Sequence, residues 1–418
     1  MQDNEKNPAL RFKGFTDPWE QRKLKELYFQ LTERNTDLLP YQKTLSVATM
    51  SFKTDGNGAA DTSLANYKRL RTGDIAFEGH TSKEFRYGRF VLNDVGDGIM
   101  SPRFSALRPL HEMPINFWKY YIHYEPIMRK VLVNSTKAGT MMNELVINDF
   151  LQGSILVPSM TEQQAIGRFF KQLDTLITLH QRKYEKLVNI KKSMLNKMFP
   201  PNGASVPEIR FKGFTDPWEQ RKLDEAFDFT VPNNTLSRAE LNQESGSVRN
   251  VHYGDVLIKY GSVLDVQNDE LPFITGRSKD DFKGALLQNG DIIIADTAED
   301  ETTGKVCEIV NIQDKDVVAG LHTMVCRPKN KTAEGYFGYY MNSSSYHHQL
   351  LPLMQGIKVL SLSKTNVQKT TVKYPKDKAE QQKIADCLRR IDTLITLHQR
   401  KLEKLQNIKK SCLEKMFV

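Results

Sequence analysis

Apolar residues recur at intervals of three and four along two long stretches of the chain, residues 162–199 and 380–417. The recurring positions are Leu173, Leu176, His180, Leu187, Ile190 and Met194 in the first stretch, and Ile391, Leu394, His398, Leu405, Ile408 and Cys412 in the second. One lysine interrupts each series, Lys183 or Lys401. This spacing is typical of heptad a and d positions on a helix that packs against another helix. The pattern therefore predicts two long helices, each with one apolar seam.

The two stretches are also copies of each other. "EQQAIGRFFKQLDTLITLHQRKYEKLVNIKKSMLNKMF" and "EQQKIADCLRRIDTLITLHQRKLEKLQNIKKSCLEKMF" are identical at 26 of 38 positions. A helix of this length reaches roughly 57 Å, which is too long for one small domain. We therefore expect the two helices to pair as an antiparallel coiled coil with a pseudo-twofold axis. The alternative is that each helix packs only on its own domain.

A shorter segment, "RFKGFTDPWEQRKL", occurs unchanged at residues 11–24 and 210–223. Between the repeats the two halves look unrelated, but landmarks recur in order. A Gly-Asp turn enters an apolar strand in "RTGDIAFE" and "QNGDIIIA", followed by "SALRP" and "MVCRP", then by "FWKYYI" and "YFGYYM". Gly139 and Gly356 each stand 19 residues before the proline that ends an apolar strand. The order predicts one framework bearing different loops, with ordinary drift after duplication as the alternative.

These features predict an α+β chain in which two globular α/β domains in pseudo-twofold arrangement are joined by two long helices that form an antiparallel coiled coil. The expected parts are the first copy of the short repeat (1–24), the first domain (25–158), the first long helix (159–200), a linker with the second copy (201–223), the second domain (224–375) and the second long helix (376–418).

Composition fits a globular protein with more than one domain: the 418 residues are 39% hydrophobic and 26% charged. No apolar run reaches the length of a membrane span, and we expect a cytoplasmic location. The net charge of +9 lies entirely in the two long repeats, +5 in the first and +4 in the second. Such charge favours contact with phosphate or an acidic partner, and a solvated face is the alternative reading.

The sequence lacks the common motifs for catalysis and cofactor binding. No strand leads into GxGxxG, and neither GxxxxGK[ST] nor HExxH occurs. The four cysteines lie far apart without CxxC spacing, which indicates neither a zinc site nor a disulfide framework. We therefore predict no catalytic residue, no metal site and no cofactor bound by this chain.

The two long repeats, each following an apolar strand and a proline, together with the repeated short segment, resemble the DNA-specificity subunit of type I restriction-modification enzymes over essentially the whole chain. The resemblance implies two target-recognition domains, each reading one part of a bipartite, asymmetric target in double-stranded DNA. It also implies partners: two methyltransferase (modification) subunits, which use S-adenosylmethionine to methylate adenine at N6, and restriction/translocase subunits, which use ATP with magnesium. The subunit itself is expected to be non-catalytic.

Arginine and lysine suit guanine and phosphate, and loops carry such readers. For the first domain we predict base contacts from Lys83, Arg86, Tyr87, Arg89 and Arg103, and phosphate contacts from Lys68, Arg69 and Arg71. For the second domain the candidates are Arg277, Ser278, Lys279, Lys283, Lys358, Ser361, Ser363 and Lys364. The alternative for most of these is a solvated surface charge. The alternative for the whole chain is a coiled-coil scaffold that organises protein partners.

Overall fold

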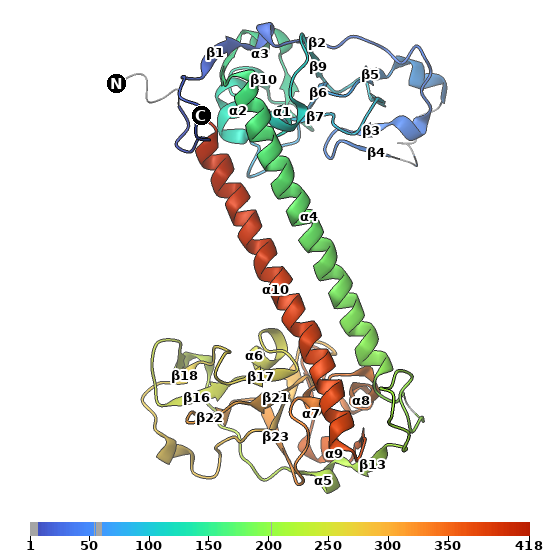
Figure 1. Ribbon diagram of the computed structural model, residues 1–418, viewed down its shortest axis with the longest axis vertical. Helices are drawn as coiled ribbons and strands as arrows, with labels where there is room; N and C mark the ends of the chain where they lie inside the picture. The colour runs from blue at the N-terminus through green and yellow to red at the C-terminus, as the bar shows by residue number, and fades with distance from the viewer. Residues whose placement is uncertain (1–6, 54, 56–60, 202) are drawn as a thin grey trace. The chain divides into compact units, whose positions relative to one another are not determined.

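The computed structural model describes residues 7–53, 55, 61–201 and 203–418, so parts of the expected 1–24 and 201–223 segments lie outside it. The chain divides into two compact units. Unit 1 consists of Met1–Gln181 and Arg400–Val418, and unit 2 of Arg182–Gln399. Each unit therefore contains part of both long helices, α4 (Met160–Lys197) and α10 (Lys378–Met416) (Figure 1).

Unit 1 is built on a four-stranded antiparallel sheet with the order β2-β9-β6-β7. Three strand pairs, β3-β4, β5-β8 and β10-β11, form separate two-stranded sheets, and β1 pairs with β12 directly before α4. The strands are β1 (Glu20–Lys23), β2 (Tyr28–Gln30), β3 (Leu45–Ser46), β4 (Ser51–Phe52), β5 (Lys68–Leu70), β6 (Ile75–Glu78), β7 (Arg89–Leu92), β8 (Gly98–Met100), β9 (Ala106–Pro109), β10 (Thr136–Lys137), β11 (Glu144–Leu145) and β12 (Ser154–Val157).

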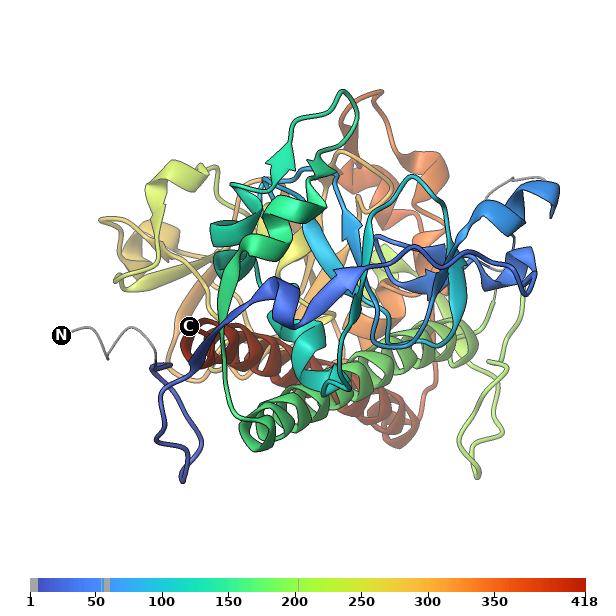
Figure 2. The same ribbon diagram turned by 90° about the horizontal axis from the view of Figure 1, so that it is seen from above.

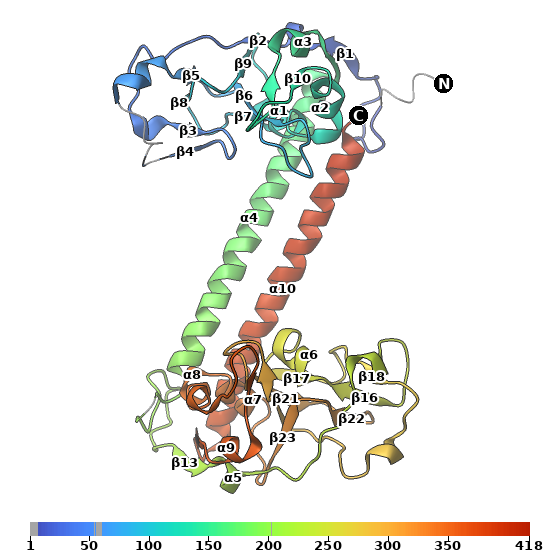
Figure 3. The same ribbon diagram turned by 180° about the vertical axis from the view of Figure 1, so that it is seen from behind.

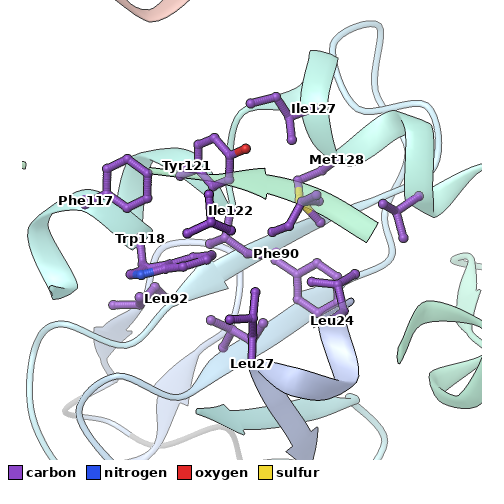
Figure 4. Packing of buried hydrophobic residues seen from close by; sticks show 14 of the residues in the cluster. Leu24, Leu27, Phe90, Leu92, Phe117, Trp118, Tyr121, Ile122, Ile127 and Met128 are labelled. Carbon is purple, nitrogen blue, oxygen red and sulfur yellow. The ribbon is translucent and has the colours of Figure 1, made fainter. Parts of the chain in front are cut away.

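Three short helices, α1 (Ile115–Tyr121), α2 (Glu125–Leu132) and α3 (Ile147–Gln152), complete unit 1. Their buried faces meet the sheet, as Figure 4 shows for Trp118 and Tyr121 of α1 beside Phe90 and Leu92 of β7. Phe417, the last aromatic residue of the chain, packs edge-on against Tyr121, with ring centroids 5.2 Å apart. The core of unit 1 therefore includes the end of α10.

Unit 2 has two larger sheets, one with the order β14-β23-β19-β21-β17 and one with the order β15-β18-β16-β22, and two separate strand pairs, β13-β25 and β20-β24. The pairs β17-β21 and β16-β22 are parallel, and the other pairs in these two sheets are antiparallel. The strands are β13 (Glu219–Lys222), β14 (Phe227–Asp228), β15 (Leu241–Asn242), β16 (Val248–Val251), β17 (Val263–Asp265), β18 (Phe273–Ile274), β19 (Ile292–Ala295), β20 (Thr297–Ala298), β21 (Val306–Val310), β22 (Asp316–Ala319), β23 (Thr323–Pro328), β24 (Leu360–Ser361) and β25 (Thr371–Tyr374).

The short helices of unit 2 are α5 (Leu223–Ala226), α6 (Tyr253–Ile258), α7 (Tyr336–Met341), α8 (Ser344–His347) and α9 (Lys364–Gln368) (Figure 3). Every residue of α7 is buried, and Tyr336 and Tyr340 of this helix pack edge-on against Phe199, which follows α4. The core of unit 2 thus includes the end of α4. None of the described helices is long and apolar enough to cross a membrane.

A buried aspartate braces the central strand of each main sheet. Gly73 and Gly290 adopt positive φ, 96° and 91°, in the turn that enters β6 or β19. The aspartate that follows is 1% exposed in both units and pairs with an arginine at the end of the neighbouring strand. These pairs are Asp74–Arg108 at 2.8 Å and Asp291–Arg327 at 2.7 Å. The Gly-Asp and Arg-Pro landmarks of the sequence are therefore the two sides of one structural contact.

The mixed α and β content and the two long helices confirm the predicted fold class. The burial pattern gives a seam with unbroken three-four alternation, at 166, 170, 173, 177, 180, 184, 187, 191, 194 and 198 of α4 and the matching positions of α10. Eight of the twelve predicted seam residues lie on it. The prediction is corrected at Leu176, Leu394 and Ile408, which are exposed and each one residue before a seam position; Ile190 is half-buried, as is Lys191 beside it, and Tyr184 and Leu402 replace the expected lysine breaks.

A lysine occupies one seam position in each helix, and it pairs across the helices with an aspartate. In unit 1, Lys409 Nζ lies 2.7 Å from Asp174 and 5.1 Å from the centre of the Tyr120 ring, and the Tyr120 hydroxyl donates to Asp174 at 2.5 Å. Burial, reinforced by the Asp174 carboxylate, raises the pKa of Tyr120, so the hydroxyl remains a proton donor.

Unit 2 contains the same cluster from the opposite helices. Lys191 of α4 lies 2.6 Å from Asp392 of α10, which accepts a hydrogen bond from the Tyr339 hydroxyl at 2.9 Å. Each cluster joins an aromatic helix of the unit to both long helices. A single polar pair in an apolar seam favours one register over its neighbours.

The repeated short segment clamps the ends of the long helices. In unit 1, Arg11 makes a bidentate pair with Glu162 in the first turn of α4, at 2.7 and 2.8 Å. Arg210 makes the same pair with Glu380 of α10 in unit 2, at the same two distances. Both copies form looped segments (dark blue and yellow-green in Figure 2). The segment "RFKGFTDPWEQRKL" is therefore repeated at least in part for internal reasons.

Replacing Arg210 by alanine should destabilise unit 2, because the Glu380 carboxylate is only 1% exposed and loses its counter-ion. Removing one partner of a buried pair costs about 3–5 kcal/mol. Thermal melting of the purified chain measures the effect, with Lys212→Ala as the control because Lys212 is an exposed cation of the same segment. Equal melting temperatures for the two variants would show that the clamp does not stabilise the fold.

Candidate functional site

A loop and a hairpin lie together at the end of the central strand in unit 1. The loop, residues 79–88, follows β6, and the hairpin of β10 and β11 has its tip at residues 138–143. The backbone N–H of Asn143 donates to the carbonyl of Gly79 at 2.8 Å, and the Asn143 side-chain amide donates to the carbonyl of Arg86 at 3.3 Å. We call residues 79–88 and 138–143 loop–hairpin surface 1.

Unit 2 repeats this frame with other residues. The loop 296–303 follows β19, and the N–H of Leu362 donates to the carbonyl of Asp296 at 2.8 Å. Residues 355–361 form the hairpin, in which Gln355 and Ser361 exchange backbone hydrogen bonds of 3.0 and 2.8 Å. Strand β24 of this hairpin also pairs with β20 of the loop. We call residues 296–303 and 355–362 loop–hairpin surface 2.

One glycine is needed in each hairpin. A Cβ atom on Gly139 would lie 2.2 Å from the carbonyl oxygen of Met142, and one on Gly356 would lie 1.9 Å from that of Val359. Both distances are far below van der Waals contact, so any side chain would force the turn open. These are the two glycines whose matched distance from a proline stood out in the sequence, and their place in the fold explains the match.

Surface 1 carries two unpaired cations. The charged groups of Lys83 and Arg86 are exposed and make no hydrogen bond or ion pair within the described part of the chain. Tyr87 is half-buried against the core. Arg89 is held internally, because its guanidinium donates to the carbonyl of Ala48 at 3.0 Å and lies 3.5 Å from Glu78.

A pocket of about 470 Å³ opens beside the end of β6. Arg103, exposed and stacked 4.6 Å from the Phe104 ring, lines it together with Lys53, Glu78 and His80. Lys53 and His80 were not among the predicted residues. Their signal in the sequence is a position just after a strand, one residue after β4 for Lys53 and two residues after β6 for His80, because the loops that follow strands often carry binding residues.

The three cations predicted to contact phosphate are used inside unit 1. Arg69 is 9% exposed and lies 3.3 Å from both Asp37 and Asp97, so its assignment is corrected to a structural one. Lys68 donates to the carbonyl of Phe104, and burial lowers its pKa. Arg71 pairs with Glu33 at 2.8 Å. The hydrogen bond from Arg71, with one from Arg108, lowers the pKa of Glu33 to about 2.

The candidates in unit 2 fall into two separate groups. Arg277, Lys279 and Lys283 are exposed around a short turn after β18, on the four-stranded sheet, and make no ion pair among the described residues. Ser278 caps that turn: its backbone N–H donates to Asp281 at 2.8 Å, which is a structural role.

The second group lies on or next to surface 2, and only Lys358 in it has a free charged group. Ser361 pairs with Thr297 in the strand pair, Ser363 caps α9, and the Lys364 ammonium donates to the carbonyl of Phe229. The facing loop is acidic, with Glu299, Asp300 and Glu301 exposed. A hydrogen bond from Thr302 lowers the pKa of Asp300, which keeps this carboxyl ionised.

Metal ligands and reactive thiols do not gather at either surface. Within the described ranges, no three His, Cys, Asp or Glu residues are placed to hold a metal ion. The thiols of Cys307 and Cys326 are buried, and burial raises their pKa, which suppresses the reactive thiolate. The chemistry available at the two surfaces is hydrogen bonding, charge and apolar contact.

The chain matches the model of the type I restriction modification DNA specificity domain twice, over residues 17–189 and 215–407, and it belongs to this family. Each match covers one set of short elements and most of one long helix. The match confirms the family that the two repeats predicted.

Individual relatives agree with this assignment. The chain is 24% identical over 301 residues to the type I restriction enzyme MjaVIII specificity subunit of Methanocaldococcus jannaschii, covering 69% of this chain and 67% of that protein. It shares its fold with the type I restriction-modification S subunit from M. genitalium (TM-score 0.54, 15% identity, 99% of each chain). A similar fold occurs in a structure describing assembly of a type I R-M system (TM-score 0.50, 15% identity, 96% of this chain and 99% of that one).

Replacing an internally paired arginine should destabilise the chain more than replacing an exposed one. Arg69→Ala should lower the free energy of unfolding of the full chain by about 1–3 kcal/mol, because a buried, ion-paired side chain is lost. Arg86→Ala should change it by no more than about 0.5 kcal/mol, since the guanidinium is exposed and unpaired. Urea denaturation measures both. A larger loss for Arg86→Ala than for Arg69→Ala would invert the assignment.

Proposed function

We propose that this chain selects the DNA sequence on which a type I restriction-modification complex acts. Each unit reads one part of a bipartite, asymmetric target in double-stranded DNA, through its loop–hairpin surface. The observation that supports the proposal most strongly is that the two surfaces share one backbone frame, held by hydrogen bonds at corresponding places, while their side chains differ. A shared frame with different side chains is what reading two different half-sites requires.

The side chains of the two surfaces suit different bases. Surface 1 offers free cations at Lys83 and Arg86, which match the guanine acceptors O6 and N7. Surface 2 offers exposed carboxylates at Glu299, Asp300 and Glu301, which can accept from the cytosine amino group, and a single free cation, Lys358. A single protein can therefore read two unlike half-sites.

In this proposal the reactions belong to partner subunits. Two methyltransferase subunits bind S-adenosylmethionine and methylate adenine at N6, and restriction subunits bind ATP with magnesium. The chain brings them to the target and sets the distance between the half-sites. The two loop–hairpin surfaces recognise the DNA sequence, and the long helices bind the methyltransferase subunits.

The docking sites are supported by exposed leucines on the long helices. Leu176 of α4 and Leu394 of α10, equivalent positions of the repeat, are each 43% exposed, and Leu179 and Leu397 are exposed to a similar degree. They lie in "DTLITLHQRK", ten residues that are identical in both helices. Exposed apolar residues that lie outside the helix seam and are present twice suit two copies of one partner surface.

Methylation mapping tests the proposal. DNA is sequenced from cells that carry this chain with a matching methyltransferase subunit, and from cells that lack only this chain. The expected result is an N6-methyladenine motif in two parts with a fixed gap, present only with the chain. The Arg86→Ala variant should lose or relax one part of that motif while the complex still assembles. If the partner is active and no motif depends on the chain, the scaffold alternative takes precedence.

Charged residues at the exposed leucines should release the methyltransferase subunits. The double variant Leu176→Asp with Leu394→Asp should abolish co-purification of the methyltransferase subunit, because an apolar contact is replaced by a desolvated charge. Val188→Asp is the matched control, since Val188 is 39% exposed and its counterpart in α10 is Gln406. Normal co-purification of the double variant would place the docking surface elsewhere.

A further inference from the structure

Each hairpin exposes an apolar side chain at its tip, and in unit 2 Val359, which is 51% exposed, is a second one. Met141 is 83% exposed in unit 1, and Ile357 is fully exposed in unit 2. Single apolar residues on a surface need no explanation. These two, however, both lie in the hairpin turn that begins at a framework glycine, Met141 two residues after Gly139 and Ile357 one residue after Gly356, in two units whose loops otherwise differ. An exposed apolar side chain in the same turn of both units favours a shared role.

Both tips are held in place by hydrogen bonds at the base of the hairpin. In unit 2, the bonds between Gln355 and Ser361 and the β20-β24 pairing fix the backbone on both sides of Ile357. In unit 1, the β10-β11 pairing and the bond from Asn143 to Gly79 do the same for Met141. A side chain carried on a fixed backbone loses less conformational entropy on binding than one on a mobile loop.

The charges beside the tips indicate the kind of partner. Lys358 directly follows Ile357, and its ammonium group is free. In unit 1, the guanidinium of Arg86 is exposed and lies 6.0 Å from the centre of the Tyr87 ring. The carbonyl of Arg86 accepts a hydrogen bond from the side chain of Asn143, two residues after Met141. A tip that is apolar in the middle and cationic at its side matches a DNA groove, where phosphates flank the base edges. The apolar group that the major groove offers is the 5-methyl of thymine.

We propose that Met141 and Ile357 enter the major groove and each packs against a thymine 5-methyl group in the half-site that its unit reads. This inference rests on the proposed function and adds an apolar reader to the charged ones. The apolar contact matters more for surface 2, because that surface has three exposed carboxylates and only one free cation to bind DNA. The contact discriminates thymine from cytosine, which lacks the methyl group.

Deoxyuridine substitution tests the contact, because deoxyuridine lacks only the 5-methyl group of thymidine. The full chain with its methyltransferase subunits binds duplexes of the mapped target in which each half-site thymine is replaced in turn. One replacement in each half-site should weaken binding about fivefold or more. Ile357→Ala should weaken binding to the thymine duplex by a similar factor. In that variant the deoxyuridine replacement in the half-site of unit 2 should cause no further loss.

Ile258→Ala is the matched control, because Ile258 is an isoleucine of unit 2, on α6, that is 86% exposed; it should bind like the unchanged chain. The inference would be overturned if neither deoxyuridine nor Ile357→Ala changed the affinity for the mapped target, or if the half-sites contained no thymine. Either result would leave the proposed function standing. The absence of any chain-dependent motif would instead refute the proposed function. Loss of the methyltransferase subunits from Ile357→Ala would assign the tip to a protein contact and also overturn the inference.

Discussion

In each unit, one short segment of the chain binds the start of one long helix and the end of the other. The pairing of the two helices in that unit depends on this contact, which we call the clamp. In unit 1, Arg11 binds Glu162 at the start of α4, while the N–H of Leu10 donates to the carbonyl of Lys415 at the end of α10, at 2.8 Å. In unit 2, Arg210 binds Glu380, and Ile209 donates to Lys197 of α4 at 2.8 Å. The clamp places a helix start beside a helix end, which fixes the antiparallel pairing within each unit.

The clamp and the lysine–aspartate–tyrosine clusters together determine where the loop–hairpin surfaces stand on their units. The clamp fixes the ends of the helices, and the Asp174 and Asp392 clusters fix their register against α1 and α7. An ion pair in the seam contributes less stability than an apolar pair would, but it penalises a slipped register. This internal role accounts in part for the identity of the short repeat. The exposed leucines of "DTLITLHQRK" have no such internal role, and they are the better sign of a shared partner.

Periodicity and repetition were enough to predict the two long helices, because both signals extend over many residues. The predicted seam was one residue too early at Leu176 and Leu394. Each is followed by an isoleucine, and the sequence does not show which residue of such an apolar pair faces the other helix. The lysine expected in each seam was placed at Lys183 or Lys401, because the sequence does not show the aspartates that Lys191 and Lys409 meet on the other helix.

The candidate site was predictable only in part, because a sequence does not separate a free cation from a paired one. Arg69 and Arg86 look alike as letters, yet the first is buried between Asp37 and Asp97 and the second is exposed. The framework glycines were visible from their spacing, whereas Met141 stood in no pattern and only the hairpin shows its position. The predicted domain boundaries, the base readers and the cofactors of the partners stay predictions.

Replacing the second domain by a copy of the first tests most directly the claim that the repeats form a common frame and that each domain recognises its half-site independently. Residues 25–158 are placed in the position of residues 224–375, between the second short repeat and the second long helix, and the methylated motif is mapped in cells with the partner subunits. The account predicts that the half-site read by unit 1 replaces the second half-site, so that the motif contains the same half-site twice in inverted orientation. A folded chain that still directs methylation to the original second half-site would contradict it.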